Sequence, residues 1–551
     1  MKIALAQLNY TIGNFALNKK KIIDAIKTSK INQADLVVFA ELALCGYPPR
    51  DFLDFDEFIE DCKNSIEEIA RECTKIACIL GAPRLNPDPK GKNLFNSAFF
   101  IEHGKIKHVV DKTLLPTYDI FDEYRYFEPN RKFELIDLKG FKIALTICED
   151  LWNAEDDPMY LQSPMDELIK LSPELMINIA ASPFDYKHSD SRKSVLSANC
   201  KKYNLPIFYV NQVGAQTELI FDGGSLVLDK EGDYIDELIY FKEEITFYSI
   251  QKSISGLEVL PEKSRKQAID PPDEAQIYEA LILGIKDYFQ KSGFTKALLG
   301  LSGGIDSALV LALAADALGA ENVLAVLLPS KYSSDHSITD AEILVKNLGC
   351  QSLVLPISNV VNEFENTLSK PFEGMNAGLA EENIQARSRA VLLMALSNKL
   401  GHILLNTSNK SEAAVGYGTL YGDMCGGISV IADLYKTQVY ELANFINRNK
   451  EIIPQNSISK PPSAELRPDQ KDSDSLPEYE ILDKILFQYI EMKQSIKDIT
   501  QLGFDEKLVK RIIKLVNSSE YKRHQAPPIL RVSPKAFGMG RKMPIVGMWK
   551  K

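Results

Sequence analysis

This chain of 551 residues has few cysteines and histidines, so neither a disulfide framework nor a zinc site is expected. It contains six His, which stand singly, and eight Cys without a Cys-x-x-Cys pair. Such cysteine usage in a long chain is typical of reduced thiols inside the cell. No apolar run approaches the roughly 18 residues that span a bilayer, and the start of the chain lacks the pattern of a signal peptide. We therefore expect a cytoplasmic protein without a membrane segment.

A surplus of basic residues is also missing. The chain has 75 acidic against 64 basic side chains and a formal net charge of −11, which argues against sequence-independent binding to nucleic acid. Its 45% hydrophobic and 25% charged residues are typical of a globular protein and exclude disorder or coiled coil as the main theme. At this length, two or more large domains are expected.

Residues 1–255 show short apolar strands that alternate with helices, which indicates an α/β domain. The predicted strands are Ile3–Leu8, Leu36–Ala40, Lys75–Leu80, Phe141–Ile147, Leu175–Ile179 and Pro206–Val210, with a hairpin formed by Asn96–Glu102 and Ile106–Asp111. The charged, Pro-bearing stretch Pro261–Asp273 breaks both periodicities. We therefore predict a first domain at 1–255, a linker at 256–275 and a second domain at 276–551.

The second domain begins with an amphipathic helix at Glu274–Lys291 and continues with alternating strands and helices. The predicted strands are Lys296–Leu301, Val323–Leu328 and Ser352–Ile357, and the helices between them are 307–318 and Ser337–Leu348. This βαβαβ order predicts a parallel, right-handed, doubly wound sheet. Further on, the Pro- and acid-rich stretch Lys460–Pro477 is predicted as a loop, either ordered or able to switch.

A glycine-rich loop lies between the strand at 296–301 and the helix that follows. Its glycines and serines allow a tight turn around a phosphate, and the N–H groups of the helix N-terminus attract an anion. Asp306 can hold Mg²⁺, which takes one or two carboxylates beside phosphate oxygens. The loop is not a Walker A motif, because the Gly-Lys-Ser/Thr ending is missing, and the alternative is a plain turn with an N-cap serine. Its residues are Gly300, Leu301, Ser302, Gly303, Gly304, Ile305, Asp306 and Ser307.

The pattern Ser-Gly-Gly-x-Asp-Ser resembles the loop of the ATP-pyrophosphatase amidotransferases, which adenylate a substrate carbonyl. Residues 296–551 as a whole are similar to NAD synthetases, on the segments Glu382–Arg389, Asn406–Glu412, Gly416–Thr419, Asp433–Thr437, Lys460–Leu466 and Tyr521–Pro528. The resemblance implies a Rossmann-like fold of the adenine nucleotide alpha hydrolase type. It also implies that Thr407 binds ATP together with the loop and that Asp306 and Glu412 hold Mg²⁺. The substrate deamido-NAD would contact Asn383, Glu412 and Lys522.

Activation by ATP suits the chemistry of a carboxylate acceptor. A carboxylate is a poor electrophile because its leaving group would be oxide, whereas an acyl adenylate offers AMP, which ammonia can displace. Lysine and Mg²⁺ spread the charge that develops on the phosphates. Since ammonia at neutral pH is mostly ammonium, such a synthetase gains from producing ammonia in place.

A source of ammonia is predicted in the first domain. Cys148 follows the strand Phe141–Ile147, where a buried Cys is commonly inert packing. Glu41 after another strand and Lys112 after the hairpin change this interpretation, because the three residues in this order resemble the triad of nitrilases and amidases. The resemblance covers about residues 1–250 and implies an αββα sandwich with glutaminase activity. Its further segments are Gly46–Asp51 and Asn211–Gly214.

The three residues can divide the work of amide hydrolysis. A thiol with a pKa of about 8.5 is mostly protonated at neutral pH and needs a base, so Glu41 takes the proton and returns it to the leaving ammonia. Lys112 stabilises the thiolate and the tetrahedral oxyanion. Attack by Cys148 on the side-chain amide of glutamine gives a thioester, and water releases glutamate.

Contacts to glutamine are implied by resemblance at Tyr118 and Ser182. The family has a basic residue shortly after the second of these, and here either Lys187 or His188 takes that place. Glu123 is either a supporting acid beside the triad or a solvated loop charge.

Together the two resemblances imply glutamine-dependent synthesis of NAD from deamido-NAD, ATP and L-glutamine, with AMP, diphosphate and glutamate as the other products. We expect ammonia to travel through an interior tunnel, and the chain to form a homo-oligomer, a dimer or larger. Neither nucleic acid nor a membrane is expected as a partner. The alternatives are another amidotransferase with a different acceptor, or a binding protein whose catalytic groups are idle.

Overall fold

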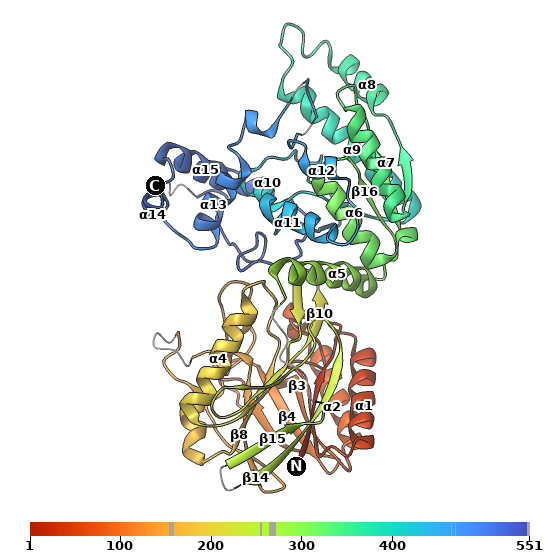
Figure 1. Cartoon of the computed structure of the whole chain (residues 1–551). Coiled ribbons are helices and arrows are strands. Elements are labelled where there is room, and N and C mark those ends of the chain that lie inside the picture. The colour runs from red at the N-terminus through yellow and green to blue at the C-terminus, as the bar shows by residue number, and fades with distance from the viewer. Residues whose placement is uncertain (154–158, 254–255, 264–270, 464, 469, 548–551) are drawn as a thin grey trace. The chain divides into compact units, whose positions relative to one another are not determined.

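The computed structural model divides the chain into two compact units, Met1–Asp270 and Pro271–Lys551 (Figure 1). It describes all residues except 154–158, 254–255, 264–270, 464, 469 and 548–551. Each unit has its own sheets and its own hydrophobic clusters. Among the described residues, no helix is long and apolar enough to cross a membrane.

The first unit contains two large sheets with helices on their outer faces, the expected αββα arrangement (Figure 1). One sheet has seven strands in the order β15 (Gly256–Pro261), β14 (Glu244–Ser253), β1 (Lys2–Gln7), β2 (Leu36–Val38), β3 (Ala77–Leu85), β4 (Leu94–Glu102) and β5 (Lys105–Asp111). The other has six, in the order β13 (Tyr234–Glu237), β12 (Leu226–Leu228), β9 (Ile207–Asn211), β8 (Leu175–Ala180), β7 (Phe141–Ile147) and β6 (Ile136–Leu138). A ribbon of β10 (Val213–Gln216) and β11 (Leu219–Asp222) and the helices α1 (Phe15–Ile31), α2 (Asp56–Glu72), α3 (Pro164–Leu168) and α4 (His188–Tyr203) complete the unit.

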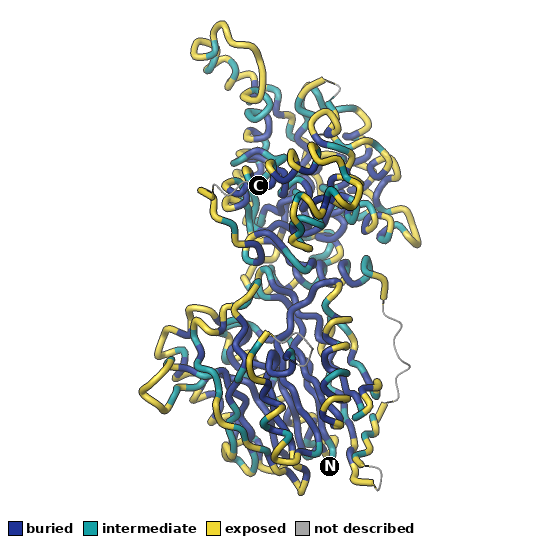
Figure 2. The backbone as a smooth tube through the Cα atoms, turned by 90° about the vertical axis from the view of Figure 1, so that its left-hand side faces the viewer, coloured by how far each residue is buried: buried dark blue, intermediate teal, exposed yellow. Residues whose placement is uncertain are grey.

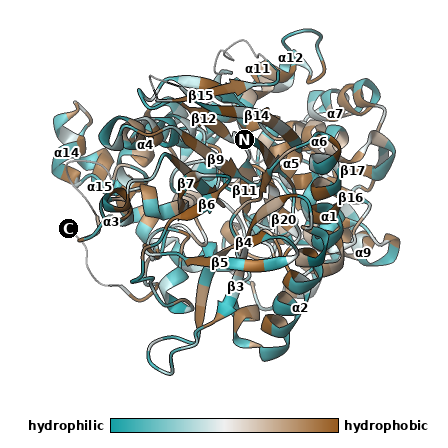
Figure 3. Ribbon diagram, turned by 90° about the horizontal axis from the view of Figure 1, so that it is seen from below, coloured by the Kyte–Doolittle hydropathy of each residue, from teal (hydrophilic) through white to brown (hydrophobic). Residues whose placement is uncertain are grey.

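Both sides of the central strands are buried, which explains their nearly continuous apolar sequences. In β1, Ile3 and Leu5 join the cluster between the two sheets, whereas Ala4 and Ala6 join the cluster beneath α1 and α2. The strands are accordingly dark blue in Figure 2. Helix α2 is apolar on one side only, with Ile59, Cys62, Ile66 and Ile69 buried, and it carries both colours in Figure 3. This spacing is that of a helix lying on a sheet.

The predicted linker at 256–275 is too long at both ends. Gly256–Pro261 forms β15, which pairs with β14 in antiparallel register, so the first domain continues beyond residue 255. At the other end, helix α5 (Asp273–Ser292) begins before residue 276. Sequence patterning missed β15 because its residues alternate between exposed and half-buried at the edge of a sheet. Residues 264–270 of the linker lie outside the described residues.

The second unit is built on a five-stranded parallel sheet, which confirms the predicted doubly wound fold. Its strand order is β18 (Gln351–Val354), β17 (Val323–Leu327), β16 (Ala297–Gly300), β19 (Ile403–Asn406) and β20 (Ile428–Ser429). Around it lie α6 (Ile305–Leu318), α7 (Asp335–Leu348), α8 (Ser358–Leu368), α9 (Leu379–Leu400), α10 (Lys410–Val415), α11 (Lys436–Ile446) and α12 (Gln455–Ser459). The strand predicted at Ser352–Ile357 is observed at Gln351–Val354, and the N–H groups of Leu355 and Ile357 continue to donate to the carbonyls of Leu327 and Pro329.

The strand order places the phosphate loop at a crevice. The chain runs from β16 to β17 on one side of the sheet and returns to β19 on the other side. The carboxyl ends of β16 and β19 therefore form the switch point at which open α/β sheets bind ligands. The loop Gly300–Ser307 follows β16 and Thr407 follows β19, so both lie at this crevice.

A helical cluster and an ordered segment close the second unit. The helices are α13 (Tyr479–Ile490), α14 (Ile496–Gln501), α15 (Glu506–Ser518) and α16 (Glu520–Arg523). In the segment 529–533, the N–H groups of Val532 and Ser533 donate to one carboxylate oxygen of Asp433 at 2.8 and 2.7 Å. The fully buried Lys410 donates to the Ser533 hydroxyl at 2.7 Å and pairs with Asp433. Segment 529–533 is thus part of the core around α10.

Candidate active sites

A lysine shared between two carboxylates marks the site of the first unit. The Nζ of Lys112 donates to Glu41 Oε1 at 2.7 Å and to Glu123 Oε1 at 2.8 Å. All three side chains are buried, and only 1% of Lys112 is exposed. Burial opposes the charge of Lys112, but the two carboxylates outweigh it and raise the pKa of Lys112 well above its usual value. Lys112 therefore stays protonated at neutral pH.

Glu123 belongs to this cluster, and its burial rules out the alternative of a solvated loop charge. Besides Lys112, it accepts a hydrogen bond from the hydroxyl of Tyr47 at 2.8 Å. Burial raises the pKa of Glu123 to about 7, against the opposing charge of Lys112. The cluster thus holds one fixed cation, Glu41 and a second acid that titrates near neutrality.

The loop that carries Glu41 after β2 is fixed from several sides. Its Oε1 accepts from Asn96 Nδ2 at 2.7 Å, and its Oε2 accepts from the N–H of Ala181 at 3.0 Å. Gly81 on β3 permits this close approach, because a Cβ there would lie 2.4 Å from the backbone nitrogen of Leu42 and 2.8 Å from Glu41 Cα. Neither Asn96 nor Gly81 stands in a local motif, so these two contacts could not be predicted from the sequence.

Cys148 lies where β7 ends and a single turn of 3₁₀ helix, Cys148–Leu151, begins. Its φ of +43° is a left-handed conformation that non-glycine residues rarely adopt and that recurs at functional sites. The side chain is buried, and burial followed by the charge of Glu41 raises the pKa of the thiol well above its usual value, although Lys112 opposes this. At rest, Cys148 is therefore a thiol within electrostatic range of both Glu41 and Lys112.

A buried acid follows the candidate nucleophile directly. Glu149 accepts hydrogen bonds from the hydroxyls of Tyr118 at 3.0 Å and Tyr160 at 2.9 Å. Burial raises the pKa of Glu149. The structure thus brings the predicted Tyr118 next to Cys148 through the carboxylate of Glu149, for which the sequence predicted no role.

Of the two candidate basic residues, His188 lies beside the predicted Ser182. The Ser182 hydroxyl and His188 Nε2 are 2.8 Å apart, and the His188 ring stacks on Trp152 with centroids 5.1 Å apart. The ammonium of Lys187 instead lies over the ring of Tyr186. Ser182 and His188 therefore form a second polar pair close to the turn that carries Cys148.

The glycine-rich loop of the second unit is preformed by its own hydrogen bonds. The Ser302 N–H donates to the Ser307 hydroxyl at 3.2 Å, and that hydroxyl donates to the Gly304 carbonyl at 3.1 Å. Gly303 has a φ of +77°, and a Cβ there would lie 2.1 Å from the Ser337 carbonyl oxygen. Helix α6 begins directly after the loop, at Ile305. The loop therefore leads directly into the N-terminus of a helix, an arrangement that attracts anions.

Asp306 lies in a network with α10 and α11. Its Oδ1 accepts from Asn409 Nδ2 at 2.9 Å, and its Oδ2 pairs with Lys436 Nζ. Burial and then the charge of Asp306 raise the pKa of Glu412 well above its usual value. Lys436 stands in the segment Asp433–Thr437, but its partner is 130 residues away along the chain, so this pairing could not be predicted from the sequence.

The donors of this network fit Mg²⁺ bound together with a phosphate. Asp306 and Glu412 supply two carboxyl groups that lie close together, since the charge of Asp306, after burial, raises the pKa of Glu412. In the part of the chain that the structure describes, no group of three or more His, Cys, Asp or Glu could hold a metal by itself. The residues present therefore suit a cation whose other ligands are phosphate oxygens and water.

Asn383 and Lys522 both contact the loop that follows α10. The hydroxyl of Thr419 donates to Asn383 Oδ1 at 2.7 Å, and Lys522 Nζ donates to the carbonyls of Gly416 and Gly418, both at 2.8 Å. Burial lowers the pKa of Lys522. The structure thus gathers Asn383 and Lys522 around Gly416–Thr419, directly after the helix that carries Glu412.

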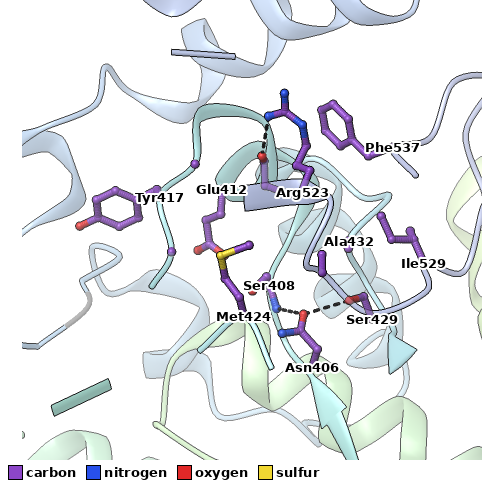
Figure 4. A pocket seen from close by; sticks show the side chains of 14 residues that line it. Asn406, Ser408, Glu412, Tyr417, Met424, Ser429, Ala432, Arg523, Ile529 and Phe537 are labelled. Atoms are coloured by element: carbon purple, nitrogen blue, oxygen red, sulfur yellow. Dashed lines mark hydrogen bonds between the residues drawn. The ribbon is translucent and has the colours of Figure 1, made fainter. Parts of the chain in front are cut away.

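A cavity of about 30 Å³ opens beside Glu412 (Figure 4). Glu412 and Ile529 reach it from opposite sides in this view. Its lining combines polar and apolar side chains, among them Asn406, Ser408, Met424, Ala432 and Phe537. A cavity of this volume has room for about two molecules of the size of water.

Comparisons with known proteins agree with this division into two sites. The carbon-nitrogen hydrolase family model matches residues 2–257, and the NAD synthase family model matches residues 277–526. The chain is 47% identical to a glutamine-dependent NAD(+) synthetase of Synechocystis sp., over 98% of each chain. It is 41% identical to that of Acinetobacter baylyi, over 100% of this chain and 99% of the other. A solved structure of the Acinetobacter baumannii enzyme with ADP is 37% identical, has a TM-score of 0.79, and is matched over 100% of this chain and 99% of its own.

Proposed function

The chain belongs to the glutamine-dependent NAD(+) synthetases, and from this premise we propose how its residues share the reaction. The first unit hydrolyses L-glutamine and supplies ammonia. The second unit uses ATP to convert the carboxylate of deamido-NAD into an acyl adenylate, which ammonia converts into NAD. The observation that carries this proposal is the buried Lys112, shared by Glu41 and Glu123 beside the strained Cys148.

In the glutaminase reaction, Glu41 is the base and Cys148 the nucleophile. The thiol is protonated at rest because burial raises its pKa, so its proton must move to Glu41 as sulfur attacks the amide carbon. Lys112 stays charged and stabilises the oxyanion of the tetrahedral intermediate. Glu41 then returns the proton to the leaving ammonia. Water hydrolyses the thioester, and glutamate leaves.

The free amino-acid end of glutamine carries two opposite charges, and the site offers a partner for each. Glu149, buried next to Cys148 and held by two tyrosine hydroxyls, is suited to the α-ammonium group. Ser182 and His188 can donate hydrogen bonds to the α-carboxylate. This pair of contacts would favour glutamine over a simple amide, because a substrate without an α-ammonium group leaves the buried Glu149 without that opposite charge.

In the second unit, the loop Gly300–Ser307 and Thr407 bind ATP, and Asn383, Glu412 and Lys522 contact deamido-NAD. Mg²⁺ bound by Asp306 and Glu412 would neutralise part of the triphosphate charge and help diphosphate to leave. Lys436 carries a fixed positive charge beside Asp306. It would also stabilise the negative charge that develops on the leaving diphosphate. When the carboxylate of deamido-NAD has displaced diphosphate from ATP and formed the acyl adenylate, the N–H groups of the loop hold the released diphosphate.

We also propose the cellular location of the enzyme, its oligomeric state and the route of ammonia. The eight cysteines are free, which supports a reducing, cytoplasmic location. A homo-oligomer, a dimer or larger, is expected and is measured by light scattering. An interior route for ammonia predicts that ¹⁵N from glutamine reaches NAD without dilution by excess unlabelled ammonium.

The central test is the Cys148→Ala variant. Glutamine-dependent formation of NAD should fall by roughly four orders of magnitude, whereas formation from ammonium should remain at the wild-type rate. Cys200→Ala, which removes another buried thiol from the same unit, is the matched control and should retain both activities. Loss of both activities in a folded Cys148→Ala enzyme would contradict the separation of the two sites.

A further inference from the structure

Asp150 joins the loops that carry two of the three triad residues. Its Oδ1 accepts hydrogen bonds from the N–H groups of Thr113 and Leu114, at 2.9 and 2.8 Å. Its Oδ2 accepts from the N–H of Ile147 at 3.0 Å. The carboxylate is buried, with 2% exposed. One side chain therefore holds the backbone directly after Lys112 and the backbone directly before Cys148.

This link spans the two sheets of the first unit. Lys112 follows β5 in the seven-stranded sheet, whereas Cys148 follows β7 in the six-stranded sheet. Strands of separate sheets share no ladder of backbone hydrogen bonds, so side chains must fix the distance between their ends. Glu41 makes a comparable link, because it follows β2 of the first sheet and accepts from the N–H of Ala181 after β8 of the second. Asp150 thus links the Lys112 loop to the Cys148 turn in the same way as Glu41 links its own loop to the end of β8.

We propose that Asp150 is a positioning residue of the glutaminase reaction, which sets the place of the Lys112 ammonium relative to the Cys148 sulfur. The inference rests on the proposed roles of these two residues. Asp150 itself would not contact glutamine, because its carboxylate oxygens accept from the backbone N–H groups of Thr113, Leu114 and Ile147.

The number and type of these bonds require a carboxylate. An asparagine of the same shape keeps one oxygen, which can still accept from two N–H groups. Its NH₂ group would then face a third N–H donor, and two donors cannot bond to each other. A buried N–H group without a partner costs about 1–3 kcal/mol, which the turn can avoid only by moving. Displacements of about 1 Å at a reacting group lower a rate by about 100-fold.

The test compares Asp150→Asn and Asp150→Ala with Asp236→Asn in the full-length enzyme. Asp236 is a matched control, because it is a buried aspartate of the same unit that accepts from the Tyr248 hydroxyl at 2.8 Å and lies outside the catalytic loops. The assays are glutamate release, which gives kcat and KM for glutamine, and NAD formation from ammonium. Alkylation of Cys148 by iodoacetamide, read by mass spectrometry, reports on the thiol itself.

We expect Asp150→Asn to lower the glutaminase kcat by about 10- to 100-fold, to change KM by less than about threefold, and to slow alkylation of Cys148. Asp150→Ala should lose more, and Asp236→Asn should keep the wild-type kcat. All three should form NAD from ammonium at the wild-type rate. A wild-type kcat in Asp150→Asn, or a change confined to KM, would overturn the inference. If the wild-type enzyme itself releases no glutamate, the proposed glutaminase function fails instead, so the two failures are distinguishable.

Discussion

Replacing Gly303 with alanine tests whether the shape of the phosphate loop matters for catalysis. The backbone at Gly303 is left-handed, with a φ of +77°, and the added Cβ would lie 2.1 Å from the Ser337 carbonyl oxygen and 2.8 Å from its carbonyl carbon. Gly349 offers a matched control in the same unit, because its φ is +76° but its Cβ would meet nothing within 4 Å. The two substitutions share the backbone strain and differ in the collision.

The expected magnitudes follow from these contacts. Left-handed backbone costs a residue with a Cβ about 1–2 kcal/mol, which is the whole effect expected for Gly349→Ala. In Gly303→Ala, overpacking against the backbone of α7 adds about 1–3 kcal/mol, unless the loop moves away from Ser337. If the loop moves by about 1 Å, the rate of the step that it supports should fall by about 100-fold.

Two measurements separate these effects. Denaturant unfolding gives the stability of each variant, and exchange of labelled diphosphate into ATP, dependent on deamido-NAD, reports on adenylation alone. We expect exchange to be nearly abolished in Gly303→Ala and unchanged in Gly349→Ala, with glutamate release intact in both. Equal exchange rates in the two variants would refute the claim that this close approach holds the loop in a productive shape.

Two further predictions concern the first unit. Gly81→Ala, whose Cβ would lie 2.4 Å from the backbone nitrogen of Leu42, should displace the Glu41 loop and lower the glutaminase kcat by at least about 10-fold, while NAD formation from ammonium persists. Gly140→Ala, with nothing within 4 Å, serves as its control, and an equal kcat in both variants would contradict the steric argument. Burial raises the pKa of Glu123 to about 7, above its unfolded value of about 4.3. The folded state therefore binds more protons between these two values, and the free energy of unfolding should fall as the pH rises through this window. Glu123→Gln should flatten that dependence, and an unchanged slope would exclude Glu123 as its source.

Much of the fold could be predicted from the sequence, because the strands that carry the sites are strongly apolar. The observed β7, Phe141–Ile147, has the predicted bounds, and the phosphate loop lies between a strand and a helix as expected. The edge strand β15 gave no such signal, since only one side of it is even partly covered. A strand that is only partly buried needs few apolar residues, so its position cannot be predicted from the pattern of apolar residues.

The supporting residues of the sites were harder to predict for a different reason. Glu123 and Asp150 carry charges whose importance depends on burial, and a carboxylate in a sequence is exposed far more often than not. Lys436 meets Asp306 only because the sheet brings α6 and α11 together. Gly81 matters through the backbone that passes over it. Such roles are created by tertiary contacts, which no local motif records.

The position of segment 529–533 has a consequence for incomplete chains. A polypeptide that stops before this segment contains every residue of the thiol site. It leaves the buried Lys410 without the Ser533 hydroxyl and the buried Asp433 without the N–H groups of Val532 and Ser533. Such a fragment would break down glutamine while producing no dinucleotide. Premature termination of translation late in the message would therefore yield a wasteful hydrolase rather than an inert protein.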